Sequence, residues 1–378
     1  RGIPLTQAGS GWDHSNPGQQ GSIAVGPEGD FHLAYWLFDN GAVYYQNWSV
    51  QSGLSAAIQI ASPLDELNAP PSIAVDARGT VHVAFVSGGN QISVTSKPRN
   101  GAFLGQPLFQ NADGLAQVSI AAGGTVQEPR VGLAYLSRTA GDLDAPGAFE
   151  VIFSEKNNAR VASSPWTSTM LHLAPNARCT PTVVLENAAQ QGDRFATVAF
   201  VGDHPQLDPD FKTTLLKMRG SAFFATPWTT AIIASSDQLA AFKPTISVRL
   251  IPESPGLAEI GYGMSGGVFT KVGGMQPRQW FDRVEAVCRS GSVGFGSDGV
   301  LAIDLEGVCY EAQVDTLVDV AFVQGGSGTH VVFTSHIETE VRPGFPKQVF
   351  DSAYYIPPSG NSLPLDEEVI THCLLGEL

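Results

Sequence analysis

Val81-His82-Val83-Ala84-Phe85-Val86 is one copy of a pattern that recurs along the chain: apolar, variable, apolar, small, aromatic, apolar. A short segment that is apolar on both sides of its backbone is typical of a strand buried on both faces of its sheet. The other copies are Phe31-His32-Leu33-Ala34-Tyr35-Trp36, Val131-Gly132-Leu133-Ala134-Tyr135-Leu136, Ala196-Thr197-Val198-Ala199-Phe200-Val201, Ala258-Glu259-Ile260-Gly261-Tyr262-Gly263 and Val318-Asp319-Val320-Ala321-Phe322-Val323.

The spacing of this pattern predicts the fold. Its aromatic residue recurs at intervals of 50, 50, 65, 62 and 60 residues. Each copy follows another apolar segment and precedes a third one of period two; a fourth is often announced by Pro-Trp, as at Pro165-Trp166 and Pro227-Trp228. Four short strands in such a repeat make one propeller blade. The sequence therefore predicts an all-β, six-bladed β-propeller of four-stranded antiparallel blades. A tandem of two β-sandwich domains, the rival architecture, would not repeat one strand signature six times.

The repeats also set the expected boundaries. Residues 1–357 are predicted to form the propeller, with residues 358–378 as a C-terminal tail packed on it. Either residues 1–8 or a strand near 348–350 is expected to complete the last blade and close the ring. The predicted blades lie near residues 21–62, 71–110, 118–173, 180–234, 243–287 and 300–352.

Composition limits the classes of partner. Asp and Glu outnumber Lys and Arg by 36 to 21, a net charge of −15, which argues against nucleic acid and against anionic lipid surfaces. No apolar run approaches the roughly 18 residues of a membrane-spanning helix, so no membrane insertion is expected. Few lysines and abundant Gly, Ser and Thr favour an extracytoplasmic location: secreted, periplasmic or at the cell surface. The start at Arg1 fits either a mature exported form or a piece of a larger protein.

The four cysteines, Cys179, Cys288, Cys309 and Cys373, lie far apart and lack the spacing of a zinc site. Cys288 and Cys309 are nearest in sequence and are the first choice for a disulfide. Four buried free thiols are the alternative.

The stretch from Ser72 to Phe85, together with the Gly-Pro-Glu-Gly-Asp turn at 26–30, resembles the BNR-like repeats of sialidase-superfamily propellers. That superfamily carries Asp-boxes, Ser-x-Asp-x-Gly-x-x-Trp, in the turns between third and fourth strands. The turns at 96–101 and 154–158 have no such box. Sialidase catalysis also needs three arginines that hold a carboxylate and a Tyr–Glu pair, and no motif brings Arg78, Arg130 and Arg249 together. The resemblance therefore implies a fold, and no catalytic residue is carried over.

The loops between second and third strands and between fourth and first strands are expected to hold the functional site, because propellers commonly bind there. Trp12, Asp13 and His14 enter the first blade and combine an aromatic ring, a carboxylate and an imidazole, a set suited to a sugar or to acid–base chemistry. The same three residues also fit a structural role that seals the ring and caps turns. Asp65 and Glu66, with Asp13 or Asp39, could supply paired carboxylates for glycoside chemistry. A solvated turn is the alternative, and it is the interpretation that the sequence favours for Asp65 and Glu66.

Two acidic loops offer oxygen ligands for Ca²⁺. One contains Asp142 and Asp144, and the other contains Asp203, His204, Asp208 and Asp210. The two loops are expected on one face of neighbouring blades, where they could converge on one ion or ligand; solvated acidic turns are the alternative. His32 and His82 occupy the same repeat position, which favours a structural role for both.

These observations favour an exported, non-catalytic recognition propeller that binds a glycan or a protein partner through its loops. Residues 44–48, Tyr-Tyr-Gln-Asn-Trp, resemble a stretch that six-bladed fucose-type lectins repeat in every blade; here it occurs once, so six equivalent sugar sites are not expected. The first alternative is a glycoside hydrolase or lyase that uses carboxylates at the channel mouth. The second alternative is a structural module of a larger surface or secretion assembly.

Overall fold

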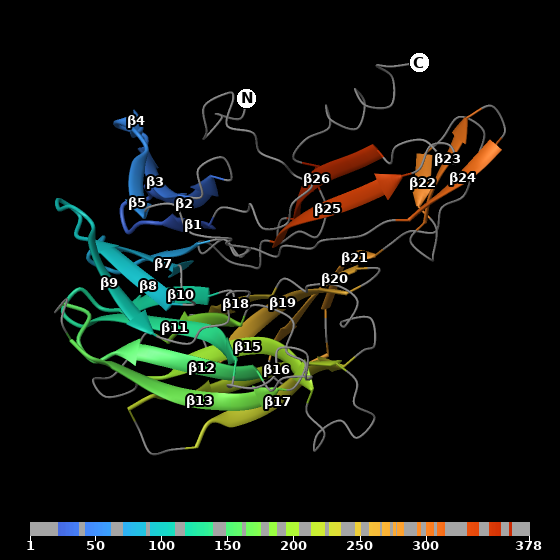
Figure 1. Ribbon diagram of the computed structural model, residues 1–378. Helices are drawn as coiled ribbons and strands as arrows, with labels where there is room; N and C mark the ends of the chain where they lie inside the picture. The colour runs from blue at the N-terminus through green and yellow to red at the C-terminus, as the bar shows by residue number, and fades with distance from the viewer. Residues whose placement is uncertain are drawn as a thin grey trace. The chain divides into compact units, whose positions relative to one another are not determined.

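The computed structural model is all-β over the residues that it describes (Figure 1). None of these residues belongs to a helix that is long and apolar enough to cross a membrane. The described residues are 22–37, 42–61, 71–87, 91–109, 118–138, 149–160, 164–174, 181–186, 194–203, 213–223, 227–235, 246–250, 257–264, 267–272, 275–276, 278–282, 293–295, 300–305, 308–313, 331–339, 348–356 and 363–364.

The chain divides into two compact units, residues 1–204 with 216–231, and residues 205–215 with 232–378. The first unit begins with a sheet of order β1-β2-β3-β4 in which β5 also pairs with β3, followed by sheets of order β6-β7-β8-β9 and β10-β11-β12-β13. Their strands are β1 (Ser22–Val25), β2 (Phe31–Leu37), β3 (Ala42–Ser49), β4 (Gly53–Leu54), β5 (Ile58–Ala61), β6 (Ser72–Val75), β7 (Val81–Ser87), β8 (Gln91–Lys97), β9 (Leu104–Phe109), β10 (Val118–Gly124), β11 (Pro129–Arg138), β12 (Phe149–Lys156) and β13 (Trp166–Ala174).

The next sheet has the order β14-β15-β16-β17, and the boundary between the two units passes through its last two strands. The second unit continues with a sheet of order β18-β19-β20-β21 and with the three-stranded sheets β22-β23-β24 and β25-β26-β27. The strands are β14 (Thr182–Leu185), β15 (Ala196–Asp203), β16 (Thr213–Gly220), β17 (Thr229–Ser235), β18 (Ile246–Leu250), β19 (Ala258–Met264), β20 (Gly267–Val272), β21 (Arg278–Asp282), β22 (Val293–Phe295), β23 (Val300–Leu305), β24 (Val308–Gln313), β25 (Val331–Thr339), β26 (Gln348–Ile356) and β27 (Leu363–Pro364).

The repeated signature forms the second strand of each of the first five sheets, as predicted: β2, β7, β11, β15 and β19. Its small residue is fully buried in Ala34, Ala84 and Ala134. Each of these alanines shares a hydrophobic cluster with the signature aromatic of the following sheet, as Ala34 does with Phe85. The alternation of small and large residues therefore allows neighbouring sheets to pack closely. The other pairs are Ala84 with Tyr135 and Ala134 with Phe200.

A serine at the start of each first strand connects neighbouring sheets of the first unit. The hydroxyl oxygen of Ser22 accepts a hydrogen bond from the backbone N–H of Ile73 at 3.2 Å, and that of Ser72 accepts one from Ile120 at 3.1 Å. These bonds connect the first strands of successive sheets. Figure 1 shows the three sheets following one another in that order. The third member of the series is Ser119, which accepts from Val183 at 3.4 Å.

The predicted blades near 21–62, 71–110, 118–173, 180–234 and 243–287 each coincide with one of the first five sheets. The region predicted as the last blade, 300–352, contributes strands to two different sheets. Its expected signature strand at 318–323 lies outside the described residues. The domain boundaries therefore stay a prediction, as does the identity of the strand that completes the last blade.

Candidate functional site

The turn between β6 and β7 forms the base of a pocket in the first unit. Asp76 follows β6, and its Oδ1 atom accepts hydrogen bonds from the backbone N–H groups of Arg78 and Thr80, both at 2.9 Å. Gly79 adopts φ +76°, a left-handed conformation that is costly for residues with a side chain. An aspartate at the start and a glycine near the end are thus the residues that this turn requires.

The second carboxylate oxygen of Asp76 faces His82 on β7. Oδ2 lies 3.4 Å from His82 Nε2, and the other ring nitrogen lies 2.8 Å from Ser96 Oγ on β8. Burial favours a higher pKa for Asp76, but the hydrogen bonds from His82, Thr80 and Arg78 together hold its pKa below the ordinary value. Asp76 is therefore an anion that the turn and His82 already satisfy. His82 thus connects the turn to β8, and the structural role expected for it from the repeat stays a prediction.

A second turn, between β8 and β9, supplies one wall of the pocket. Gly101 donates its backbone N–H to the carbonyl of Pro98 at 2.9 Å, which closes the turn and leaves Arg99 and Asn100 exposed at its tip. Arg99 forms an ion pair with Glu28 from the first sheet. Phe103 is half-buried and contacts the ring of Tyr45 edge-on, with the centroids 5.0 Å apart.

The opposite wall comes from the turn between β12 and β13 of the next sheet. Asn157 donates its backbone N–H to the Pro165 carbonyl at 3.0 Å, and the Asn158 side chain accepts from the Arg160 N–H at 3.0 Å. These bonds fix the turn and leave Arg160 exposed. Lys156, the last residue of β12, is half-buried, and burial lowers the pKa of its ammonium group.

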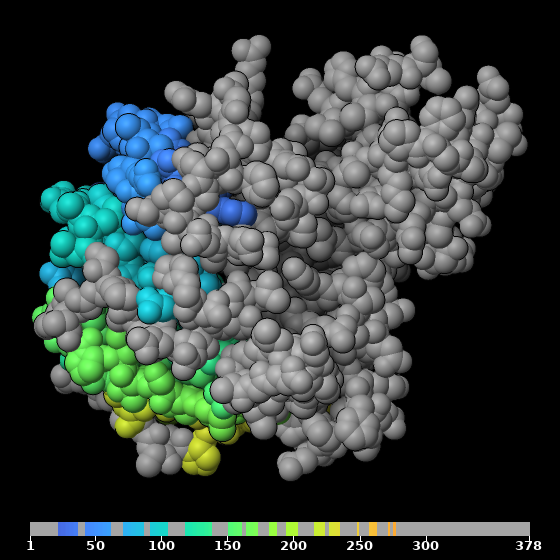
Figure 2. All heavy atoms as spheres, in the orientation of Figure 1, coloured from blue at the N-terminus to red at the C-terminus, as the bar shows by residue number. Residues whose placement is uncertain are grey.

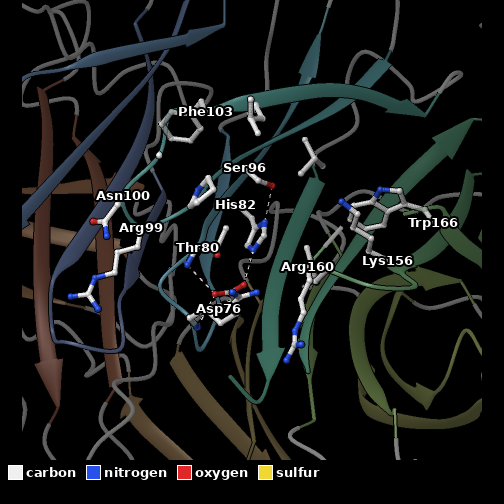
Figure 3. Close-up of a pocket in the computed structure, with 17 residues that line it drawn as sticks. Asp76, Thr80, His82, Ser96, Arg99, Asn100, Phe103, Lys156, Arg160 and Trp166 are labelled. Atoms are coloured by element: carbon white, nitrogen blue, oxygen red, sulfur yellow. Dashed lines mark hydrogen bonds and ion pairs between the residues drawn. The ribbon is translucent and has the colours of Figure 1, made fainter. Parts of the chain in front are cut away.

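The two walls enclose a pocket of about 920 Å³, large enough for a small ligand. In Figure 2 the coloured surfaces of the two sheets that form it adjoin one another. Figure 3 shows side chains of both walls around Asp76 and His82. The described residues that line it are Asp76, Arg78, Thr80, His82, Val94, Ser96, Pro98, Arg99, Asn100, Gly101, Phe103, Leu104, Val131, Lys156, Ala159, Arg160 and Trp166.

Ion pairs connect the β10–β13 sheet to the chain that follows it. Arg130 donates to Glu155 from Nε at 2.8 Å, and both side chains are buried. Arg194 reaches the same carboxylate at 3.1 Å. Glu186 accepts two hydrogen bonds from Arg219, at 2.6 and 2.7 Å. Each of these three arginines therefore pairs with a carboxylate within the protein.

The first sheet provides the same imidazole–carboxylate pairing by a different route. Its turn has Gly26 where the second sheet has Asp76, and the carboxylate comes instead from Asp30, whose Oδ2 lies 2.8 Å from His32 Nε2. A Cβ atom at Gly26 would lie only 2.2 Å from Asp30 Oδ1, so a side chain there would displace the carboxylate. His32 Nδ1 lies 2.7 Å from the Tyr45 hydroxyl. Burial lowers the pKa of His32 despite the opposing effect of Asp30.

Most of the site residues predicted from sequence lie outside the described residues. Asp203 ends β15 and Cys309 lies in β24 opposite Asp304, but the side chains of both are outside the described part. Within that part, no group of three or more His, Cys, Asp or Glu residues is placed to hold a metal ion. The calcium loops and the disulfide stay predictions. The residues outside are Trp12, Asp13, His14, Asp39, Asp65, Glu66, Asp142, Asp144, His204, Asp208, Asp210 and Cys288.

The pocket lies at the opposite strand ends from the loops favoured by the sequence. It is built from turns between first and second strands and between third and fourth strands. Two of these turns are the segments at 96–101 and 154–158 that have no Asp-box, and the cations in and beside them, together with Trp166, are the sequence features that point to the pocket. Of the three arginines considered for a sialidase-like site, Arg78 lines the pocket and Arg130 is buried against Glu155.

Comparison with known proteins identifies the fold class. No family model matches the sequence, and no curated protein matches it. The structure is similar to the Aleuria aurantia lectin, a fungal lectin of six-bladed β-propeller fold, with 8% identity, a TM-score of 0.50, and coverage of 92% of this chain and 95% of that chain. A mutant of that lectin in complex with Fucα1-6GlcNAc gives 9% identity, a TM-score of 0.50, and coverage of 92% and 94%.

The BP39L lectin from Burkholderia pseudomallei gives 11% identity and a TM-score of 0.49, with coverage of 89% of this chain and 81% of that chain. The chain has the fold of a six-bladed β-propeller of antiparallel blades, on the likeness to the Aleuria aurantia lectin, and four of the seven sheets in its described part have the four strands of a propeller blade. This confirms the fold class expected from the sequence.

Proposed function

We propose that the chain is a non-catalytic, carbohydrate-binding propeller that holds a saccharide in the pocket between the β6–β9 and β10–β13 sheets. The observation that carries the proposal is the lining itself. The half-buried indole of Trp166 stands in a hollow whose other walls carry guanidinium, ammonium, amide and hydroxyl groups. A sugar ring has one apolar face that packs on an aromatic side chain and a rim of hydroxyls that needs such polar partners.

The fold likeness supports the same proposal. The Aleuria aurantia lectin has been solved with Fucα1-6GlcNAc, so a propeller of this form can bind a saccharide. An extracytoplasmic location, where glycans are displayed, is part of the proposal. Membership of the sialidase superfamily, with its BNR-like repeats, stays a prediction from residues 72–85.

The enzyme alternative is not favoured at this pocket. Glycoside hydrolysis uses two carboxyl groups about 5 to 9.5 Å apart. Asp76 is the one carboxylate among the described residues that line the pocket, and it is 3% exposed and held by its own turn. A protein partner and a structural module are the remaining alternatives, and the experiment below separates them from a lectin.

The test is a glycan-array screen of the full chain, followed by titration calorimetry with the best saccharide. Two half-buried tryptophans are compared, Trp166→Ala in the pocket and Trp48→Ala in the lectin-like stretch of the first sheet. Loss of aromatic packing worth about 1.4 kcal/mol weakens binding about tenfold, so Trp166→Ala is expected to lose at least that much. Trp48→Ala is expected to bind as the unmodified chain does.

Both variants must first show the circular dichroism spectrum and unfolding midpoint of a folded chain. Binding that survives Trp166→Ala but is lost in Trp48→Ala would move the site to the first sheet and overturn the proposal. Absence of binding to every saccharide on the array would overturn it as well and favour a protein partner or a structural module.

A further inference from the structure

The charge of the pocket differs in sign from that of the chain. Four of the described side chains that line it are cations, whereas Asp76 is the one carboxylate. The whole chain carries a net charge of −15. A patch of opposite sign on an acidic protein concentrates ligands of negative charge. The four cations are Arg78, Arg99, Lys156 and Arg160.

Asp76 offsets one of these four positive charges, and its carboxylate is held by its own turn and by His82. Its Oδ1 atom accepts from the backbone N–H groups of Arg78 and Thr80, and its Oδ2 atom faces His82. The side chain of Asp76 is 2% exposed. Glu28 partly balances the charge of Arg99.

The wall formed by the β12–β13 turn carries the cations best placed for a ligand. Arg160 is exposed, and its Nη2 atom lies 3.4 Å from the carbonyl oxygen of Val126, a neutral group. Lys156 is half-buried and lines the same wall as Trp166. A partly desolvated ammonium group gains more from an anion than one in open water does. Arginine suits carboxylate and sulfate groups because its planar fork donates two parallel hydrogen bonds.

We infer that the saccharide bound in this pocket is acidic and bears a carboxylate or a sulfate ester. The sugar ring packs on Trp166 while its anionic group faces Arg160 and Lys156. This inference rests on the proposed function and adds the ligand class to it. Carboxylate and sulfate share the recognised chemistry, so the experiment distinguishes the two.

The experiment uses matched saccharides that differ in charge alone. Polygalacturonate is compared with its methyl ester, and a sulfated glycosaminoglycan is compared with the same chain after desulfation. The acidic member of one pair is expected to bind at least tenfold more tightly than its neutral counterpart. Its affinity is expected to fall as NaCl is raised, because salt screens exposed charges. The pair that responds identifies carboxylate or sulfate as the anion.

Substitutions then locate the charge effect. Arg160→Ala and Lys156→Ala are expected to weaken the acidic ligand about tenfold each. Lys97→Ala is the matched control, since Lys97 ends β8 as Lys156 ends β12 but does not line the pocket. The side chain of Arg160 is exposed, so its variant keeps the test valid if Lys156→Ala fails to fold.

Two outcomes separate this inference from the proposed function. Equal binding of acidic and neutral members, insensitive to salt but lost in Trp166→Ala, would overturn the acidic ligand and leave a lectin pocket in place. No saccharide binding at all would overturn the proposed function and the inference with it. Acidic binding that Lys97→Ala abolishes and Arg160→Ala leaves unchanged would also overturn the inference.

Discussion

Arg130 and Glu155 face each other across neighbouring strands β11 and β12, with Nε to Oε1 at 2.8 Å and Nη2 to Oε2 at 3.2 Å. The side chains are 5% and 0% exposed, so little water reaches either charge. Arg130 also donates to the carbonyl of Glu186, which follows β14 in the next sheet, at 2.6 Å. One buried guanidinium therefore joins two strands of its own sheet to the sheet that follows.

Removing this carboxylate charge is expected to destabilise the chain strongly. Glu155→Gln leaves Arg130 buried without its counter-charge and also removes the partner of Arg194. Breaking a buried pair from one side costs about 3–5 kcal/mol, which guanidinium denaturation monitored by tryptophan fluorescence can measure. Glu28→Gln, which removes the exposed pair with Arg99, is the matched control and is expected to leave the midpoint nearly unchanged. Equal midpoints for the two variants would contradict this account of the buried pair.

Asp76 is expected to make stability depend on pH in the acid range. Its pKa in the folded chain is below the ordinary value of 3.8, since hydrogen bonds from His82, Thr80 and Arg78 outweigh burial. The stabilisation is therefore complete above pH 3.8 and is lost as the pH falls through the folded value. Asp76→Asn is expected to show a shallower loss of unfolding free energy between pH 6 and about pH 3 than the unmodified chain. If the free energy of unfolding falls equally with pH in the variant and in the unmodified chain, Asp76 contributes nothing to the pH dependence of stability.

His32 is expected to make the free energy of unfolding depend on pH near pH 6. Burial holds its pKa below the ordinary 6.5, so the imidazole is neutral in the folded chain while the unfolded chain takes up a proton first. Stability from this residue is thus present above pH 6.5 and is lost as the pH falls from there through the folded pKa. In His32→Gln the fall in unfolding free energy between about pH 7 and pH 5 should be smaller. A fall at least as steep in the variant would disprove the assignment.

The serine hydrogen bonds between first strands are expected to contribute modestly. Ser72→Ala removes the acceptor for the Ile120 N–H, and a single hydrogen bond contributes about 0.5–1.5 kcal/mol. Urea denaturation gives this difference directly. Ser52→Ala, in the exposed turn where Ser52 bonds with Ser49, is the control and should cost less. A larger loss of stability in Ser52→Ala than in Ser72→Ala would show that the hydrogen bond between the sheets is not the stabilising feature.

The fold was predictable because its signal is local and repeated. Alanine beside an aromatic ring recurs at the same strand position, and the packing of Ala34 with Phe85 is what that recurrence requires. The pocket was not predictable in the same way, since its walls lie some 60 residues apart in sequence, from Arg99 to Arg160. The distance between these walls depends on how closely the two sheets pack, and the periodicity of the sequence carries no information about that packing. The acidic loops around Asp142 and Asp203 keep their status as predictions.

The central claim is that a saccharide binds against Trp166 between the β6–β9 and β10–β13 sheets. The most direct test is a crystal structure of the chain with the tightest-binding saccharide from the array. The account predicts a sugar ring on the Trp166 indole, with its polar groups within hydrogen-bond distance of Arg160 or Lys156. A saccharide bound elsewhere, such as at the acidic loops, with this pocket filled by water alone, would contradict the claim.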